Sequence, residues 1–128
     1  MPPINSIVLI DDDHDDHEIF SLALKEAAPA IECFYFDSAK FAIKKLSVEK
    51  NLQPDFIFLD LNMPGMNGIQ ALEELKKEET ISDIPVVVYS TSILPAEKEK
   101  ALQLGASFFF IKPSSIAELV KSLKEILD

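Results

Sequence analysis

Charged and hydroxyl side chains follow the short apolar runs of this sequence, at the points where the runs stop. The residues at these positions are Asp11, Asp12, Asp60, Ser90, Thr91 and Lys112. A continuous apolar run such as "FIFL" before Asp60 is typical of a strand buried on both faces of a sheet. A polar group directly after such a strand is partly withdrawn from water. These six residues are therefore the first candidates for chemistry.

Three of the six are carboxylates, and carboxylates that converge on one crevice repel one another more strongly as water is excluded. Either one carboxyl stays protonated or a divalent cation binds. Oxygen ligands without nearby cysteine or histidine favour Mg²⁺, which usually keeps several of its waters. Asp11, Asp12 and Asp60 are therefore predicted to form a magnesium site.

Lys112 would add a positive charge from the opposite side of this crevice. A cation, an ammonium, a hydroxyl and an exposed carboxylate suit the transfer of a phosphoryl group onto the carboxylate, which gives an acyl phosphate. The metal and the lysine would neutralise charge on the transferring group. The chemistry that these residue types predict is phosphoryl transfer.

Five apolar runs alternate with helical patterns and must position these groups. We predict strands over 7–10, 31–36, 56–59, 85–89 and 107–111, with helices between them and after the last. This alternation predicts an α/β fold, a doubly wound five-stranded parallel sheet with helices on both faces. In such sheets, sites form beyond the carboxyl ends of the strands, at the switch point in strand order.

The acidic segment after the first strand is predicted to start a helix. Asp13 can cap this helix, with Asp16 three positions later in the manner of a capping box. We expect Asp15 and Asp16 to be solvent-facing charges. His14 and His17 lie one turn apart and could ligate a transition metal, but exposed helix residues are the favoured interpretation.

Two further expectations concern the core. Ser38 is predicted to cap the second helix, whose inner face would carry Phe41, Ala42 and Leu46. The three phenylalanines at 108–110 are expected to lie mainly in the core.

The composition limits the class of protein. The 128 residues fit one domain, 1–128, and the formal net charge of −10 disfavours nucleic acid as a direct partner, because phosphate binding needs clustered Lys and Arg. No apolar stretch approaches the roughly 20 residues that span a bilayer, and no secretory signal is evident. The single cysteine, Cys33, is expected to be a buried thiol, so a reducing, cytoplasmic location fits.

Four stretches in order, "LIDDD", "FLDLNMPGMNG", "VVVYSTS" and "GASFFFIKP", resemble the signature segments of two-component response-regulator receiver domains. The resemblance covers the whole chain. It implies the CheY-like fold, with strand order 2-1-3-4-5, and a switch that works by phosphorylation.

The resemblance also implies a role for each matched residue of the site. Asp60 would be the phosphoacceptor, Asp12 a direct Mg²⁺ ligand and Asp11 a ligand that acts largely through water. Asn62 would lend its backbone carbonyl to the metal, and Lys112 would contact the phosphoryl group.

Two further matches concern the response to phosphorylation. Ser90 would be the switch hydroxyl that moves to hydrogen-bond the phosphoryl group. Phe109 stands where the family has an aromatic side chain that turns inward, although a purely structural role in the core is the alternative. The Lys112–Pro113 peptide bond matches a position that is usually cis in the family.

The register of the acidic pair stays open at this point. A third acid follows the usual pair, so the pair could be Asp12 and Asp13 instead of Asp11 and Asp12. The length of the first strand favours the earlier pair, since Asp11 directly follows the apolar run. Asn67 replaces an Asp that is common in this loop of the family, and we expect it only to shape the turn.

The implied function is that of a stand-alone receiver without an output domain, a signalling switch and not a metabolic enzyme. A sensor histidine kinase or a histidine phosphotransfer protein would donate the phosphoryl group to Asp60 with Mg²⁺. The signal would leave by contact with an unknown downstream protein, through a surface made by the fourth helix, the fifth strand and the fifth helix. The chain would be a monomer or a weak dimer.

Two alternatives come from other classes of protein. One is a hydrolase similar to the haloacid-dehalogenase phosphatases, but those carry a D-x-D pair after the first strand, whereas Asp60 follows the third. The other is a binding module that keeps the fold and works without phosphorylation. The complete set of acidic, hydroxyl and lysine residues disfavours that module.

Overall fold

A five-stranded parallel sheet forms the centre of the protein. The structure is a computed structural model and describes residues 4–49, 51–61, 63, 67–91 and 94–127. The strands are β1 (Ser6–Ile10), β2 (Glu32–Phe36), β3 (Phe56–Leu59), β4 (Val86–Ser90) and β5 (Phe108–Ile111). Their order in the sheet is β2-β1-β3-β4-β5, and every neighbouring pair is parallel. The predicted strand order is therefore confirmed.

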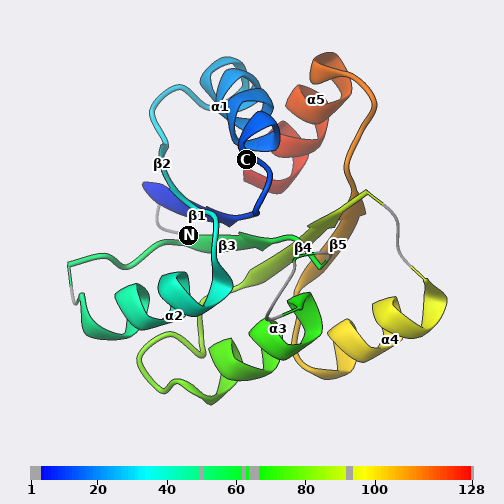
Figure 1. Ribbon diagram of the computed structural model, residues 1–128. Helices are drawn as coiled ribbons and strands as arrows, with labels where there is room; N and C mark the ends of the chain where they lie inside the picture. The colour runs from blue at the N-terminus through cyan, green and yellow to red at the C-terminus, as the bar shows by residue number, and fades with distance from the viewer. Residues whose placement is uncertain (1–3, 50, 62, 64–66, 92–93, 128) are drawn as a thin grey trace.

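Helices cover both faces of the sheet, as Figure 1 shows. α1 (His14–Ala27) and α5 (Ile116–Leu127) pack side by side on one face. α2 (Ala39–Val48), α3 (Gly68–Lys77) and α4 (Pro95–Gln103) cover the opposite face. None of the described helices is both long enough and apolar enough to cross a membrane. The predicted doubly wound α/β class is confirmed.

Alternate residues of the central strands face opposite helical layers. Val8 and Ile10 of β1 belong to the core cluster beneath α2, α3 and α4, whereas Ile7 and Leu9 belong to the cluster beneath α1 and α5. All four side chains are fully buried. Both faces of the central strands are thus covered, which explains why these strands are continuous apolar runs in the sequence.

Side chains cap the N-termini of the first three helices, and the caps of α1 and α2 follow the preceding strands closely. The Asp13 side chain caps α1 by accepting the N–H of Asp15, and the Ser38 side chain caps α2. Asn67 caps α3 and forms a reciprocal capping box with Gln70. The caps predicted at Asp13 and Ser38 are confirmed. Because Asp13 caps α1 only three residues after the end of β1, the connection between them is short. The first turn of α1 therefore stays close to the edge of the sheet.

The inner face of α2 differs from the predicted one at Phe41. Ala42 and Leu46 are buried as predicted, but Phe41 is 59% exposed, and Ile43 takes an inward position instead. The Phe41 ring lies beside Phe36, with 5.9 Å between ring centroids. The prediction was wrong for Phe41 because the short apolar pattern of this helix fits two neighbouring stripes.

The edge strand β5 is less buried than predicted. Phe108 is 50% exposed, which contradicts its assignment to the core, while Phe109 and Phe110 are partly buried on opposite faces of the sheet. Within the part of the chain that the structure describes, only β4 pairs with β5. An apolar run does not reveal whether its strand lies at an edge, and this is the physical reason for the error.

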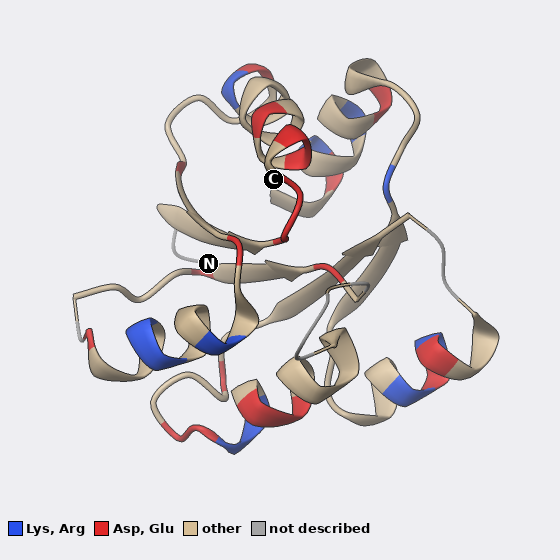
Figure 2. Cartoon of the chain, in the orientation of Figure 1, with Lys and Arg blue, Asp and Glu red and all other residues tan. Residues whose placement is uncertain are grey.

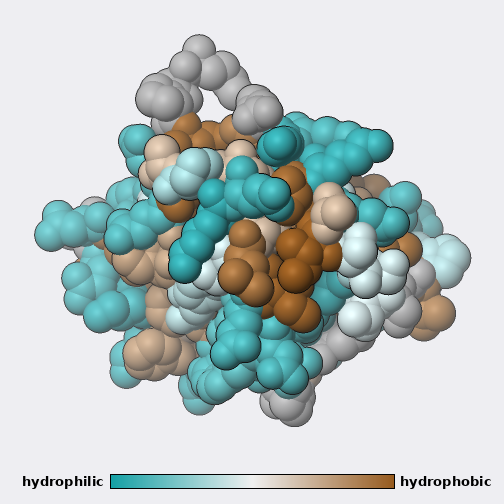
Figure 3. Space-filling view, turned by 90° about the horizontal axis from the view of Figure 1, so that it is seen from above, coloured by the Kyte–Doolittle hydropathy of each residue, from teal (hydrophilic) through white to brown (hydrophobic). Residues whose placement is uncertain are grey.

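Apolar side chains are also exposed on the outer face of α1 and α5. They are Ile19 (40% exposed), Leu22 (56%) and Ile116 (41%). Figure 3 looks down on these two helices and shows apolar surface bordered by hydrophilic side chains. Exposed apolar surface with a polar border is typical of protein contact sites. This helix face is therefore a candidate surface for a partner protein.

Charge is unevenly distributed over the chain. Acidic residues, red in Figure 2, follow one another where α1 begins, next to the carboxyl ends of the strands. α2, on the other face, carries Lys40, Lys44 and Lys45 and no acidic residue. Part of the negative charge of the sequence thus lies at the edge where the polar residues of the strand ends meet.

Cys33 lies on β2 and packs, partly buried, against the core cluster of α1 and α5. Burial raises the pKa of its thiol to about 12. The thiol is therefore protonated at neutral pH, which agrees with the interpretation as an unreactive core residue.

We expect Cys33 to react slowly with a disulfide reagent such as Ellman's reagent in the folded protein at pH 8. A shift of the pKa from 9.0 to about 12 lowers the thiolate fraction at this pH roughly a thousandfold. Reaction rates in buffer and in guanidinium chloride measure the effect, and the unfolded chain should react at the rate of a free cysteine. Equal rates in both solvents would contradict the burial of the thiol.

Gly68, the first residue of α3, lies too close to the end of β3 for any larger side chain. A Cβ atom at this position would lie 2.2 Å from the Cα of Leu61 and 2.9 Å from the carbonyl oxygen of Asp60. We expect Gly68→Ala to lower the free energy of unfolding by about 1–3 kcal/mol, since backbone must shift to admit the methyl group. Urea denaturation followed by circular dichroism measures the change. Lys77→Ala, at the exposed end of the same helix, is the control and should change stability by less than about 0.5 kcal/mol.

Candidate functional site

Backbone hydrogen bonds of the sheet continue into the polar residues at its carboxyl edge. The Asp11 N–H donates to the carbonyl of the last residue of β2, and the Asp60 N–H donates to that of the last residue of β1. On the other side, the Lys112 N–H donates to the carbonyl of Ser90. Neighbouring strands thus hold the backbones of these residues, and the site shares the rigidity of the sheet.

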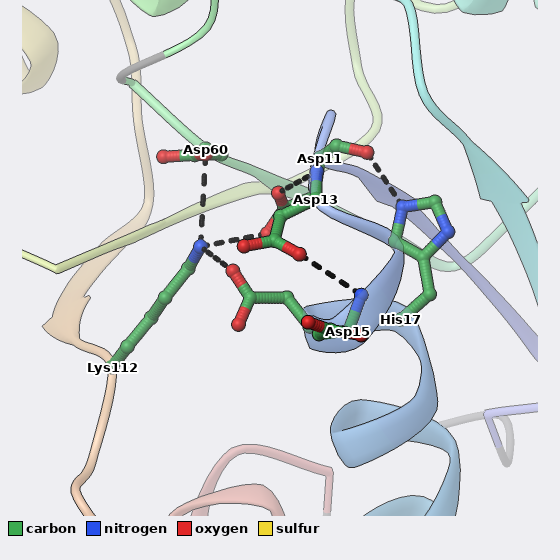
Figure 4. A network of polar contacts seen from close by, with 7 residues as sticks. Asp11, Asp13, Asp15, His17, Asp60 and Lys112 are labelled. Carbon is green, nitrogen blue, oxygen red and sulfur yellow. Dashed lines mark hydrogen bonds and ion pairs between the residues drawn. The ribbon is translucent and has the colours of Figure 1, made fainter.

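The Lys112 ammonium lies among three carboxylates, in the network that Figure 4 shows from close by. Its Nζ is 2.7 Å from Oδ2 of Asp11, 2.6 Å from Oδ2 of Asp16 and 3.6 Å from Oδ2 of Asp60. Only 8% of the lysine side chain is exposed, and Asp11 and Asp60 are buried. The ammonium also lies 5.2 Å from the centre of the Tyr89 ring, a favourable cation–π distance.

Burial and charge act in opposite directions on the two most buried members of this network. Burial by itself lowers the pKa of the Lys112 ammonium, but its hydrogen bonds to Asp11 and Asp16 and the charge of Asp60 outweigh burial and raise that pKa. Burial raises the pKa of Asp11 to about 6, although the hydrogen bond from Lys112 opposes the shift. At neutral pH the site therefore contains a permanent ammonium and an ionised Asp11.

One ammonium does not neutralise the acidic cluster. Carboxylate oxygens of Asp11, Asp12 and Asp60 all lie within 4.8 Å of one another. These donors are hard oxygens, and Asp12 is exposed, which leaves room for the waters that Mg²⁺ retains. The three residues thus fit a divalent cation of this kind, and Mg²⁺ bound there would supply positive charge to anionic oxygens near Asp60.

The geometry also bears on which acids form the pair at the end of β1. The Asp13 carboxylate caps α1 by accepting the N–H of Asp15. Among the described residues, the carboxylate cluster consists of Asp11, Asp12 and Asp60 and does not include Asp13. The Asp11 carboxylate turns into the site and accepts the N–H of Asp13. The cluster therefore contains Asp11 and Asp12, in the register that strand length favoured.

Comparison with known proteins shows the family to which this chain belongs. The family model of the response regulator receiver domain matches residues 7–124. The chain belongs to this family. The match places it with receiver domains and not with the haloacid-dehalogenase phosphatases.

Relatives of this receiver domain include regulators of several kinds. The phosphate regulon transcriptional regulatory protein PhoB of Pseudomonas aeruginosa is 32% identical over 122 residues, which cover 95% of this chain and 51% of PhoB. The phosphorylated cyanobacterial phytochrome response regulator RcpA matches with a TM-score of 0.85 and 30% identity, over 96% of this chain and 91% of RcpA. The Mn²⁺-bound response regulator Rcp1 matches with a TM-score of 0.81 and 25% identity, over 95% of this chain and 91% of Rcp1.

The chain spans between 51% and 61% of the length of the curated relatives that it matches first. Receiver domains are signalling switches of two-component systems, and phosphorylation on aspartate is a general feature of the family. Binding of a divalent cation at an acidic site is a second general feature of the family. The cluster of Asp11, Asp12 and Asp60 in this receiver agrees with that feature.

Ser90 and Thr91 lie at the end of β4 in this receiver domain but differ in exposure. Ser90 is fully buried, whereas Thr91 is exposed. The backbone hydrogen bond from the Lys112 N–H to the Ser90 carbonyl places both residues at the same edge of the sheet. Of the two hydroxyls, that of Ser90 is enclosed within the receiver.

Phe109 of the receiver lies on β5 and is partly buried against the core cluster of α2, α3 and α4. It lines a hollow between α4 and β5 whose other lining residues are Pro95, Lys98, Phe110 and Ile111. A hollow on one side of an aromatic ring leaves space for a change of rotamer. Phe109 thus combines a core contact with access to an open space.

Two further expectations from the family resemblance concern Asn62 and the Lys112–Pro113 peptide bond. Asn62, predicted to supply a backbone carbonyl to the metal, lies outside the described residues. The Lys112–Pro113 bond, at a position usually cis in receivers, is trans in this structure. The trans form is the more stable isomer of an X–Pro bond in general.

Asp16 is a site residue that sequence reasoning missed. It was predicted to face solvent, but its carboxylate lies 2.6 Å from the Lys112 ammonium and is 23% exposed. The capping bond predicted for Asp16 is not among the side-chain bonds of the described residues. Its place on the first turn of a helix that starts at the site was the available signal, since that turn has one side facing the strand ends.

His17 was likewise predicted to be exposed and is partly buried. Its Nε2 lies 2.5 Å from the backbone carbonyl oxygen of Asp11, and its ring packs beside that of Tyr35 at 5.4 Å between centroids. His14 is exposed as predicted and pairs with Asp37. His17 therefore supports the backbone that carries the acidic pair. A histidine one turn after an acidic pair was too weak a signal for this contact.

We expect Mg²⁺ to raise the midpoint of thermal unfolding of this receiver, because only the folded chain brings the three carboxylates together. A tenfold excess of Mg²⁺ over its Kd corresponds to about 1.4 kcal/mol of added stability. Asp12→Asn should remove most of this increase and should raise the midpoint measured without Mg²⁺, since one repelling charge is lost. Thermal denaturation followed by circular dichroism at several Mg²⁺ concentrations tests both effects.

The control for this experiment is Glu18→Gln, which removes one exposed negative charge from α1. It should leave the Mg²⁺-dependent increase unchanged. An increase that survives in Asp12→Asn would show that Mg²⁺ binds elsewhere.

Proposed function

We propose that this receiver accepts a phosphoryl group on Asp60 and acts as a phosphorylation-driven signalling switch. The observation that carries the proposal is the meeting of the Lys112 ammonium with the carboxylates of Asp11, Asp12 and Asp60 at one edge of the sheet. This arrangement offers an anionic nucleophile, a fixed cation and a set of metal-binding oxygens within a few ångströms.

The transfer step follows from these groups. An Oδ atom of Asp60 attacks the phosphorus of a phosphohistidine, an acyl phosphate O–P bond forms, and the N–P bond of the donor breaks. The electron pair of the broken bond stays on the imidazole, which takes a proton from solvent. Lys112 stabilises the negative charge on the phosphoryl oxygens. Asp11 and Asp12 would hold Mg²⁺, which would supply further positive charge to these oxygens. Asn62 would contribute its backbone carbonyl to the metal.

The response to phosphorylation would begin at Ser90. Its buried hydroxyl would donate a hydrogen bond to a phosphoryl oxygen, and the movement of the Ser90 side chain would open space next to β5. Phe109 would then turn inward, since it already lines the hollow between α4 and β5. The surface formed by α4, β5 and α5 would change with it, including the exposed residues Phe108 and Ile111.

Partners follow from this scheme. The donor would be a sensor histidine kinase or a histidine phosphotransfer protein in the cytoplasm, and the apolar face of α1 and α5 beside the site is suited to a protein donor. The output would be contact with a downstream protein, and the receiver would be monomeric or weakly dimeric. Its chemistry would be limited to its own phosphorylation and dephosphorylation, without turnover of a metabolite.

The test is labelling with acetyl phosphate and Mg²⁺. We expect the mass of the intact protein to increase by one phosphoryl group, because a small phosphate donor needs no partner protein. Asp60→Asn should abolish the increase, since an amide lacks the nucleophilic oxygen anion. Omission of Mg²⁺ should reduce labelling strongly. Hydroxylamine should remove the label, as expected for an acyl phosphate.

Asp37→Asn is the matched control for this experiment. Asp37 also follows a strand directly, but its side chain is 61% exposed and pairs with His14 away from the cluster. This variant should be labelled like the unmodified protein. Labelling that persists in Asp60→Asn would move the acceptor to another residue.

A further inference from the structure

The Lys112 ammonium has a second close anionic partner besides Asp11. Asp16, on the first turn of α1, approaches it to 2.6 Å, the shortest of the three separations between this ammonium and a carboxylate. Asp16 is not a member of the cluster that could hold a metal ion. Its interaction with the site therefore passes through Lys112.

These contacts draw the ammonium closer to Asp11 and Asp16 than to Oδ2 of the acceptor. Nζ is within hydrogen-bond distance of Asp11 and Asp16, but 3.6 Å from Oδ2 of Asp60. A phosphoryl group on Asp60 would present oxygens that compete for the same ammonium. Lys112 must then share or give up one of its two present hydrogen bonds.

The burial of the two partners indicates which bond is given up. Asp11 has no exposed surface and also accepts the N–H of Asp13, so water cannot take the place of the ammonium there. Asp16 is 23% exposed, so water can solvate its carboxylate once the lysine has left. The bond to Asp16 is the one that can be released at the lower cost.

We propose that Asp16 is a positioning residue that draws Lys112 closer to itself than to Asp60 in the unphosphorylated receiver and releases it when Asp60 carries a phosphoryl group. This inference rests on the proposed function, since it assigns Asp60 as the acceptor. Asp16 stabilises the unphosphorylated state relative to the phosphorylated one. Removal of its charge therefore makes Lys112 more available to the phosphoryl oxygens and strengthens their binding.

The test uses beryllofluoride with Mg²⁺ as a stable mimic of the phosphoryl group, with binding followed by ¹⁹F NMR. Asp16→Asn should bind beryllofluoride about tenfold more tightly than the unmodified protein, the effect of losing one charged hydrogen bond that competes with the ligand. Asp15→Asn is the matched control, with the same change of charge on the neighbouring, exposed residue. Its affinity should stay within about twofold of the unmodified protein, and the difference from Asp16→Asn should persist in 0.5 M KCl because salt screens exposed charges best.

Two further variants distinguish positioning from a structural role. Asp16→Glu keeps the charge and should keep an affinity close to that of the unmodified protein. In a Lys112→Ala background, Asp16→Asn should have no more effect than Asp15→Asn, because the residue through which Asp16 acts is gone. Circular dichroism of each variant shows that the fold is kept.

The outcomes separate this inference from the proposed function. If the unmodified protein fails to bind beryllofluoride, the assignment of Asp60 as the phosphoacceptor is wrong, and so is the role proposed for Asp16. If the unmodified protein binds but Asp16→Asn is no tighter than Asp15→Asn, only the role of Asp16 is overturned. An equal gain from Asp16→Asn with and without Lys112 would overturn it too, since it would show an effect of charge alone.

Discussion

The buried ammonium of Lys112 compensates part of the negative charge at the carboxyl edge of the sheet, and the rest of the site depends on it. Lys112 is 8% exposed and Asp11 has no exposed surface, so each would be costly to bury alone. Hydrogen bonds of 2.7 and 2.6 Å to Asp11 and Asp16 make the arrangement stable. Because one positive charge faces more than one negative charge, the site remains suited to a divalent cation.

The parallel arrangement of the strands brings Lys112 and the carboxylates together. Asp11 and Lys112 are 101 positions apart in the chain, yet both follow strands whose carboxyl ends lie at the same edge. Their backbones are held by hydrogen bonds from neighbouring strands, so a response to phosphorylation would fall on side chains and on the flanking helices. Rigid strands and movable side chains together suit a switch in which a local change of charge alters a distant surface.

The places where sequence reasoning failed have a common cause. Phe41 and Phe108 were assigned to the core and are exposed, because apolar patterns do not reveal the exact rotation of a short helix or which strand lies at an edge. Asp16 and His17 were assigned to solvent and instead contact the site. In each case the local sequence allows both placements, and the packing of α1, α2 and β5 against the sheet selects one.

The sequence by itself determined the α/β class, the strand order implied by the family resemblance, the helix caps at Asp13 and Ser38, and the gathering of acids and Lys112 at one edge. Continuous apolar strands and polar residues at their ends are local features, so they can be recognised without coordinates. Only the tertiary structure decided that Asp11 is fully buried, that Asp13 lies outside the cluster of Asp11, Asp12 and Asp60, and that Asp16 shares the ammonium of Lys112. These outcomes depend on distances between separate elements, which no local pattern records.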